Sequence, residues 1–144
     1  MFNEPPDEDI RRLLDQTRRI AVVGLSPKPH RDSHRVALYL QDRGYVVVPV
    51  YPREETIVGA PVYRRVQDIA GSVDLVDVFR RSEELPRVVD DAIAAGAPAI
   101  WFQLDCIHEE AATRAAGAGM TVVMDRCIMV EHARLLGRAW SPVL

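Results

Sequence analysis

The hydrophobic positions along the chain repeat one pattern, in which a short apolar run is followed by a stretch with helical spacing. Nearly continuous apolar runs rich in β-branched residues are typical of parallel strands that are covered on both faces. The runs begin about 20–30 residues apart, which is the length of one strand–helix unit. The predicted strands are Arg19–Gly24, Tyr45–Val50, Val73–Phe79, Ala99–Phe102 and Thr121–Met124.

Helices are predicted in the gaps between these strands. The clearest one follows the third strand, where Ser82 is expected to cap the first turn and Gly96 to end the last. Apolar residues recur between them at helical spacing from Leu85, which predicts a core-facing stripe. Further helices are predicted at Asp7–Thr17, Ser33–Arg43, Ile107–Ala116 and Cys127–Gly137, with a loop over Arg53–Ser72 that holds a short helix near Arg65–Ala70.

This alternation predicts an α/β fold with a Rossmann-like, doubly wound parallel sheet of about five strands. Right-handed crossovers leave few topologies, and we expect the strand order 3-2-1-4-5, with the flavodoxin-like order 2-1-3-4-5 as the alternative. Pro49 has no N–H to donate, so it is expected to mark the end of the second strand. In either order, ligands bind at the carboxyl ends of the strands, near the point where the strand order reverses.

Length and composition narrow the class of protein. The chain has 144 residues and a mass of 16.2 kDa, so we expect a single domain over residues 1–144. A formal net charge of −3 does not favour nucleic acid as a partner. No apolar run approaches the roughly 20 residues of a membrane helix, and the acidic N-terminus does not resemble a signal peptide. These features predict a soluble, cytoplasmic protein with no membrane partner.

The loop after the first strand is the strongest candidate for chemistry, because it opens a helix at the expected ligand edge of the sheet. It runs from Gly24 past the hydroxyl of Ser26 to Ser33, where free N–H groups at the helix start favour an anion. Arg31 and Lys28, which is the only lysine in the chain, add positive charge. The alternative is an ordinary solvated loop in which Ser33 only caps its helix.

The motifs that mark other nucleotide sites are missing from this loop. Neither G-x-G-x-x-G nor G-x-x-x-x-G-K-[ST] occurs, so the sequence carries no dinucleotide or P-loop fingerprint. After the second strand come Tyr51, Pro52 and Arg53, where an NAD site would place an acid for the ribose hydroxyls. A guanidinium matches phosphate oxygens bidentately, so Arg53 indicates another phosphate contact.

The third and fourth strands end in residues that suit a base or a charged group. Phe79 and Trp101 are placed to flank an adenine ring, and Gln103 to read its edge. Arg80 follows the third strand directly and is expected to contact a ligand. The alternatives are that both aromatic residues pack in the core, and that Arg80 pairs with Glu83 or Glu84.

Two cysteines and two histidines form the remaining candidate group, namely Cys106, His108, Cys127 and His132. Their spacing matches no zinc signature, and a free cysteine often serves as a small buried hydrophobe. A catalytic pair of Cys127 and His132 lacks a third group to orient the imidazole. We therefore expect no metal site and assign no catalytic residue.

Five segments occur in order from about Ile20 to His132: GLSPKPHRDSHRV, YVVVPVYP, VDVFR, WFQL and MDRCIMVEH. Together they resemble the stand-alone bacterial CoA-binding proteins, which are similar to the N-terminal CoA-binding domain of the succinyl-CoA synthetase α subunit. The resemblance implies a domain that holds CoA or an acyl-CoA across the strand ends. It implies phosphate contacts from Gly24, Ser26, Lys28, Arg31 and Ser33, a nucleotide lining of Tyr51, Pro52 and Arg53, and a border of the adenine or the pantetheine path at Phe79, Arg80 and Gln103.

Two positions depart from the pattern of that family. Tyr51 stands where the family usually shows asparagine, and its larger ring would stack on the base or narrow the cleft. Asp105 stands where the family usually shows glycine, and no contact is carried over to it.

The leading functional hypothesis is non-catalytic binding of CoA or an acyl-CoA. The synthetase needs a second domain with a phosphorylated histidine and a nucleotide-grasping subunit, and this sequence ends at Leu144 without either, so ligase activity is not expected. Two alternatives stay open: a small NAD(P)-linked or cysteine-dependent enzyme, and an interaction domain with a vestigial nucleotide site. A homo-oligomer or another protein partner stays open as well.

Overall fold

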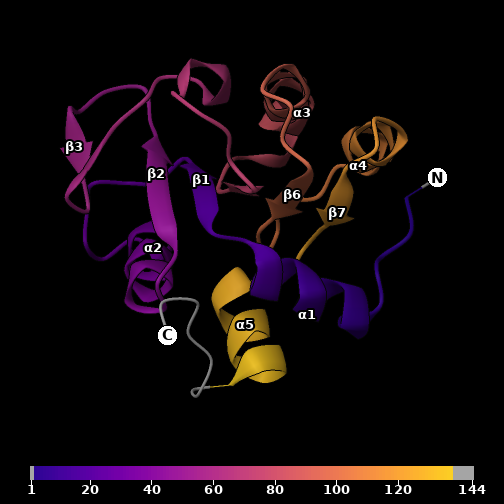
Figure 1. The fold of residues 1–144 in the computed structure, drawn as a ribbon. Coiled ribbons are helices and arrows are strands. Elements are labelled where there is room, and N and C mark those ends of the chain that lie inside the picture. Colours follow the sequence, from indigo (N-terminus) through magenta and orange to yellow (C-terminus); the bar gives the residue numbers. More distant parts are fainter. Residues whose placement is uncertain (1, 138–144) are drawn as a thin grey trace.

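The structure is a computed structural model that describes residues 2–137 as a five-stranded parallel sheet between two layers of helices (Figure 1). The long strands are β1 (Arg19–Val23), β2 (Val46–Val50), β5 (Leu75–Val78), β6 (Ala99–Phe102) and β7 (Thr121–Val123). The helices are α1 (Asp7–Gln16), α2 (Asp32–Asp42), α3 (Leu85–Ala94), α4 (Glu109–Gly117) and α5 (Ile128–Leu136). The strands lie in the order β2-β1-β5-β6-β7, so the predicted doubly wound parallel sheet is confirmed.

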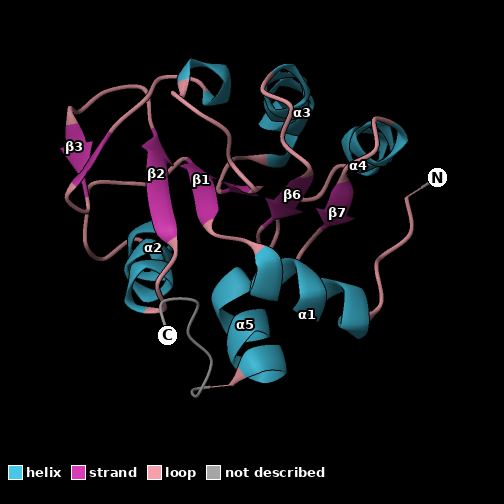
Figure 2. Cartoon of the chain, viewed as in Figure 1, coloured by secondary structure: helices cyan, strands magenta, loops and turns pink. Residues whose placement is uncertain are grey.

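Helices α3 and α4 cover one face of the sheet, and α1, α2 and α5 cover the other (Figure 2). Successive strand residues point to opposite faces, so Ile100 of β6 packs on the α3 side and Trp101 on the α5 side. Both faces are therefore apolar, which explains the nearly continuous apolar runs. No helix within residues 2–137 has both the length and the apolar character needed to cross a membrane.

The expected strand order 3-2-1-4-5 is wrong, because the third long strand, β5, pairs with β1 and not with β2. The observed order is the flavodoxin-like alternative, 2-1-3-4-5. Asp74 fixes this pairing, since its carboxylate accepts the backbone N–H groups of Arg18 at 3.0 Å and Arg19 at 2.9 Å. The Arg19 guanidinium donates in turn to the carbonyls of Ala70 and Ser72. The segment before β5 is thereby anchored at the start of β1.

Pro49 does not end the second strand, as the sequence had suggested, but lies inside β2. This strand is at the edge of the sheet, and the carbonyl of Pro49 points away from β1 to accept the N–H of Tyr63 at 3.0 Å. The amide nitrogen and the carbonyl of one strand residue point to the same side, so the missing N–H costs no bond to β1. A proline within a strand indicates an edge position, and here it favours the observed order.

The segment between β2 and β5 contains more structure than predicted. It holds the hairpin strands β3 (Thr56–Ile57) and β4 (Ala60–Pro61) and the short 3-10 helix η1 (Val66–Asp68). The expected cap of α3 is also different, because Ser82 lies in a second 3-10 helix, η2 (Ser82–Glu84). Its hydroxyl accepts the N–H of Ile107 at 3.0 Å and so ties the loop after β5 to the loop after β6.

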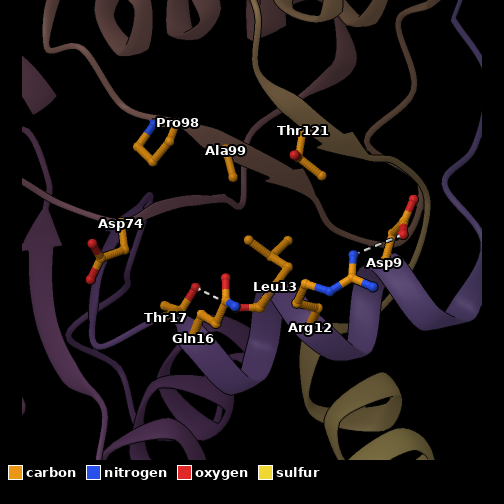
Figure 3. Close-up of a pocket in the computed structure, with 9 residues that line it drawn as sticks. All are labelled: Asp9, Arg12, Leu13, Gln16, Thr17, Asp74, Pro98, Ala99 and Thr121. Carbon is orange, nitrogen blue, oxygen red and sulfur yellow. Dashed lines mark hydrogen bonds and ion pairs between the residues drawn. The ribbon is translucent and has the colours of Figure 1, made fainter.

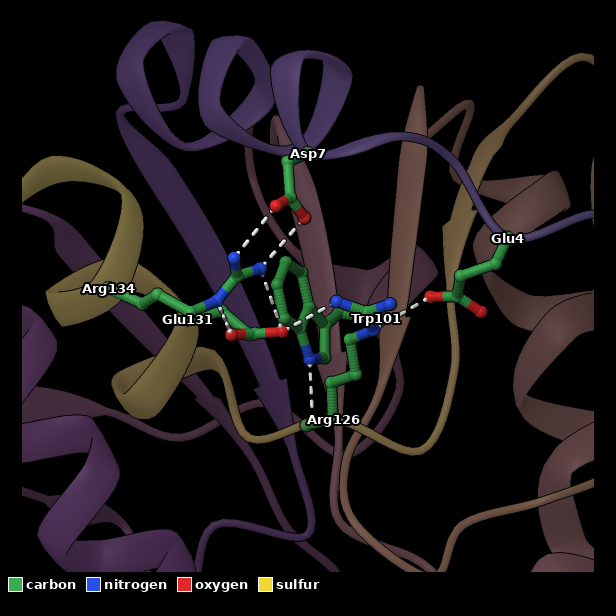
Figure 4. Close-up of polar contacts among 6 residues, drawn as sticks. All are labelled: Glu4, Asp7, Trp101, Arg126, Glu131 and Arg134. Carbon is green, nitrogen blue, oxygen red and sulfur yellow. Dashed lines mark hydrogen bonds and ion pairs between the residues drawn. The ribbon is translucent and has the colours of Figure 1, made fainter.

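An ion-pair network joins the N-terminal segment to α5 and the loop before it (Figure 4). The buried carboxylate of Glu131 accepts from Arg126 at 2.7 Å and from Arg134 at 2.8 Å. Arg134 also binds both carboxylate oxygens of Asp7 at 2.8 Å, and Arg126 pairs with Glu4 at 3.1 Å. The hydrogen bond from Arg134 is the main cause that lowers the pKa of Glu131. The ion pair between Arg134 and Asp7 thus joins α5 to α1.

One carboxyl group lies in the middle of the sheet. Asp77 of β5 is fully buried, its Oδ1 accepts the amide N–H of Gln103 at 2.5 Å, and its Oδ2 has no hydrogen-bond partner. Burial raises the pKa of Asp77 to about 7, although the hydrogen bond from Gln103 acts in the opposite direction. The ionised carboxylate is therefore the unfavourable form in the folded protein.

We expect Asp77→Asn to be more stable than the wild type at about pH 8 and to lose most of this advantage at about pH 5. Asp77 ionises at about pH 4 in an unfolded chain but only at about 7 in the fold, so wild-type stability falls as the pH rises through that interval. The asparagine side chain does not ionise, so the variant keeps the free energy of unfolding that the wild type loses, which is on the order of a few kcal/mol. Urea unfolding of both proteins at the two pH values measures the difference.

The matched control is Glu55→Gln, which removes an exposed carboxyl group. Its stability relative to the wild type is expected to be the same at both pH values. An equal advantage of Asp77→Asn at the two pH values would show that Asp77 does not titrate with a raised pKa.

Candidate functional site

The strand order reverses between β1 and β5, and the loops that follow these strands meet at their carboxyl ends. Phe79, directly after β5, donates its N–H to the carbonyl of Val23 at 2.8 Å. Gly24, which follows Val23 at the end of β1, has a φ of 83°. A Cβ on Gly24 would lie 2.0 Å from the carbonyl oxygen of Phe79. The two loops can approach this closely only because residue 24 has no side chain.

A cleft of about 440 Å³ opens beside this contact and gathers most of the residues that the sequence singled out. It is lined by Gly24, Ser26, Lys28, Arg31, Asp32, Ser33, Tyr51, Arg53 and Phe79. These residues follow β1, β2 and β5, whose carboxyl ends lie at one edge of the sheet. Of the predicted site residues, Pro52, Arg80 and Gln103 do not line this cleft.

Two serines hold the loop after β1 in shape. Ser33 is buried, and its hydroxyl accepts the N–H of Ser26 at 3.0 Å. The hydroxyl of Ser26 accepts the N–H of Lys28 at 3.1 Å. Ser33 is therefore not the cap of α2, which begins after Arg31 without a side-chain cap. The first N–H groups of α2, at Asp32 and Ser33, have no acceptor within their own helix, and both residues border the cleft.

The cleft carries positive charge that the protein does not neutralise. Within residues 2–137, most arginines bind carboxylates or carbonyl groups, and only a few basic side chains make neither an ion pair nor a hydrogen bond. These are Arg11, Lys28, Arg31, Arg53, Arg80 and Arg87. Lys28, Arg31 and Arg53 lie at the cleft, whereas its acid, Asp32, is paired with Arg35. Such a site attracts anions.

Two half-buried aromatic rings complete the cleft. The Arg53 guanidinium lies 5.3 Å from the centroid of the Tyr51 ring, which is a cation–π contact. Phe79 supplies the second ring, at the contact with Gly24. Aromatic faces beside basic side chains suit a nucleotide, because bases stack on rings and phosphates bind cations.

Pro52 and Arg80 line a neighbouring pocket on the α3 side of the strand ends. The ion pair considered for Arg80 is made by Arg81 instead, which lies 3.3 Å from Glu84. Arg87, which the sequence did not single out, lines the same pocket from α3. An exposed polar position on a helix carries no signal of function, so only the fold reveals this residue.

Gln103 and Trp101 are buried in the core and do not line the cleft. Gln103 is 4% exposed and is bound to Asp77. Trp101 is fully buried, and its indole N–H donates to the carbonyl of Arg126 at 2.8 Å. The core alternative for Trp101 is therefore correct, and the proposed sandwich of an adenine between Trp101 and Phe79 does not form.

The cysteines and histidines serve local roles in the structure. The Cys106 thiol donates to the carbonyl of Arg80 at 3.0 Å, and burial raises its pKa. Nδ1 of His108 caps α4 by accepting the N–H of Ala111 at 3.0 Å. Within the described part of the chain, no three His, Cys, Asp or Glu side chains are grouped so that they could hold a metal ion.

His132 is buried in α5, with Nδ1 2.9 Å from the hydroxyl of Tyr39. Burial lowers its pKa to about 4, so the imidazole is neutral at neutral pH. Cys127 precedes α5 as its N-cap residue. This arrangement gives no support to a catalytic pair of Cys127 and His132.

Asp105 adopts a backbone conformation that glycine usually occupies. Its φ is 67°, and its N–H donates to the carboxylate of Asp125 at 2.8 Å. Aspartate tolerates this left-handed region better than most residues. Asp105 can therefore replace the usual glycine at this position. Its hydrogen bond to Asp125 joins the loops after β6 and β7.

A larger cavity, of about 530 Å³, lies at the opposite end of the strands between α1 and the sheet (Figure 3). Its charged groups are already bound within the protein. Arg12 pairs with Asp9 at 3.2 Å and Glu8 at 3.9 Å, and Asp74 holds the start of β1. The chemistry therefore favours the smaller cleft at the carboxyl ends.

Comparisons with known proteins agree with the observed fold and point to one family. The family model described as a CoA binding domain matches residues 18–133. The uncharacterized protein YneT of Bacillus subtilis (strain 168) is 42% identical over 132 residues, which are 92% of this chain and 98% of that protein. A hypothetical protein from Pyrococcus horikoshii OT3 has a TM-score of 0.89 at 43% identity, covering 92% of this chain and 94% of that one. The dinucleotide forming acetyl-coenzyme A synthetase 1 of Ca. Korarchaeum cryptofilum has a TM-score of 0.68 at 27% identity, covering 79% of this chain and 27% of that one.

We expect Gly24→Ala to destabilise the protein much more than Gly59→Ala. Both glycines have positive φ, so an alanine at either position costs about 1–2 kcal/mol of backbone strain. Only at Gly24 would the new Cβ also overlap a backbone carbonyl, whereas nothing lies within 4 Å at Gly59. The total for Gly24→Ala is expected to exceed about 4 kcal/mol. Urea unfolding measures both losses, and equal losses would contradict the close approach of the two loops.

Proposed function

This chain belongs to the CoA binding domain family, and from that premise we propose that it binds CoA or an acyl-CoA at the carboxyl ends of its strands without catalysing a reaction. The observation that carries the proposal is the presence of three unpaired basic residues, Lys28, Arg31 and Arg53, in one cleft beside the start of α2. The segments that resemble CoA-binding proteins in the sequence supply most of the residues around this cleft.

The cleft suits the nucleotide end of CoA, which carries a pyrophosphate and a 3′-phosphate. Guanidinium groups bind phosphate oxygens bidentately, and the free N–H groups at the start of α2 favour a negative charge. A volume of about 440 Å³ lies within the range of small-molecule sites. Tyr51 and Phe79 offer ring faces for the adenine.

The same residues argue against NAD as the preferred ligand. An NAD site needs an acid after the second strand for the ribose hydroxyls, and this chain has Arg53 there. The acid that lies at the cleft, Asp32, is paired with Arg35. NAD also lacks a 3′-phosphate, so it would leave one of the three basic residues without an anionic partner.

The residues around the site support binding rather than chemistry. The Cys106 thiol has a raised pKa and is held by a backbone carbonyl, so it is a poor nucleophile. His132 is neutral and bound to Tyr39 in the core. A poorly nucleophilic thiol and a neutral, buried imidazole favour a carrier or sensor of CoA over an enzyme.

CoA at about a hundredfold its dissociation constant is expected to stabilise the fold by about 2.7 kcal/mol, seen as a raised Tm. Lys28→Ala and Arg53→Ala each remove one charged partner and are expected to weaken CoA binding about tenfold or more. Isothermal titration calorimetry with CoA, dephospho-CoA and NAD measures these differences. Dephospho-CoA is expected to bind more weakly than CoA, and NAD more weakly still.

Arg11→Ala is the matched control, because Arg11 is also exposed and unpaired among the described residues but does not line the cleft. It is expected to bind CoA like the wild type. The proposal fails if NAD stabilises the protein as much as CoA does, or if both cleft variants bind CoA as well as Arg11→Ala.

A further inference from the structure

A second pocket adjoins the cleft on the α3 side of the strand ends, and four arginines line it: Arg64, Arg65, Arg80 and Arg87. We call it the arginine pocket. Its volume is about 240 Å³, and its apolar lining consists mainly of valines from β1, β2, η1 and α3. Sites for whole ligands usually have at least about 300 Å³, so this pocket suits a small group and not a nucleotide.

The charges of the arginine pocket do not balance. Asp91 pairs with Arg65 at 2.8 Å, and Glu84 is engaged by Arg81, which lies outside the pocket. The side chains of Arg80 and Arg87 make no ion pair or hydrogen bond within residues 2–137. An anion is the group that this pocket lacks.

Arg64 connects the pocket to the nucleotide cleft. Its guanidinium donates to the carbonyl oxygens of Tyr51 at 3.2 Å, Arg53 at 3.0 Å and Glu54 at 2.9 Å. Carbonyl groups carry no net charge, so Arg64 keeps its positive charge and adds to the positive electrostatic potential of the pocket. The same hydrogen bonds hold the loop after β2, which lies between the pocket and the cleft.

A continuous surface leads from the cleft to the arginine pocket. A third hollow, of about 500 Å³, shares Phe79 with the cleft and shares Arg80 and Glu84 with the pocket. Leu104, which is 59% exposed, gives this hollow an apolar wall. An extended chain with amide and methylene groups, such as a pantetheine arm, suits such a surface, and its far end would come to Arg80.

We propose that the arginine pocket binds a carboxylate at the end of the acyl group, so that the ligand is the CoA thioester of a short dicarboxylic acid. This inference rests on the proposed function. The basic residues of the cleft already serve the nucleotide phosphates, the valines suit the methylene groups of the acyl chain, and a guanidinium binds a carboxylate bidentately. The phosphate of CoA itself is the other source of an anion, and the test separates the two.

The test compares glutaryl-CoA with pentanoyl-CoA, which has the same carbon skeleton and a methyl group in place of the carboxylate. Isothermal titration calorimetry on the wild type is expected to give about tenfold or more tighter binding of glutaryl-CoA. In Arg87→Gln this preference is expected to fall to about one, with the affinities for CoA and pentanoyl-CoA unchanged. Arg87 is exposed and unpaired within the described chain, so this variant is expected to fold normally. Arg11→Gln is the control and should keep the preference.

Three results would overturn the inference in distinguishable ways. Equal binding of glutaryl-CoA and pentanoyl-CoA by the wild type, with tight binding of CoA, rejects the acyl carboxylate and leaves the proposed function intact. An equal loss of all three ligands in Arg87→Gln assigns this arginine to a CoA phosphate. Absence of binding by every CoA compound rejects the proposed function together with the inference.

Discussion

The close approach of the loops after β1 and β5 is the constraint on which the candidate site depends. The carbonyl oxygen of Phe79 lies where a side chain on residue 24 would begin, so the approach requires glycine at that position. This contact brings Phe79 beside the loop that carries Lys28 and Arg31. The shape of the cleft therefore depends on one backbone contact at the point where the strand order reverses.

Charge pairing distinguishes the two ends of the sheet more clearly than cavity volume does. The cavity between α1 and the sheet is the larger one, but its arginine and its aspartates are bound within the protein. At the carboxyl ends of the strands, several basic side chains make no ion pair or hydrogen bond among the described residues, namely Lys28, Arg31, Arg53, Arg80 and Arg87. Leaving several like charges close together costs stability, and a bound anion offsets that cost. This imbalance is the physical basis for placing the ligand there.

Several polar residues that suggested chemistry in the sequence are instead part of the core. Gln103 satisfies the buried carboxyl of Asp77, and His132 is bound to Tyr39 between two helices. Burial shifts the pKa of Asp77 upward and that of His132 downward, so both favour their neutral forms. These groups join neighbouring elements within the core and do not line the cleft. Their partners lie far away in the sequence, which is why no local pattern revealed them.

The long strands, the layered fold and the meeting of Lys28, Arg31 and Arg53 could be predicted from the sequence, because carboxyl ends of parallel strands necessarily share one edge. The sequence did not determine the strand order, since both candidate orders satisfy right-handed crossovers and the same apolar pattern. The position of Pro49 was the one local sign of the observed order. The hydrogen bonds that the backbone N–H groups of Arg18 and Arg19 donate to Asp74 hold β5 beside β1, and they join residues more than 50 positions apart. The arginine pocket likewise exists only in the tertiary structure, because its members come from segments that the sequence alone does not bring together.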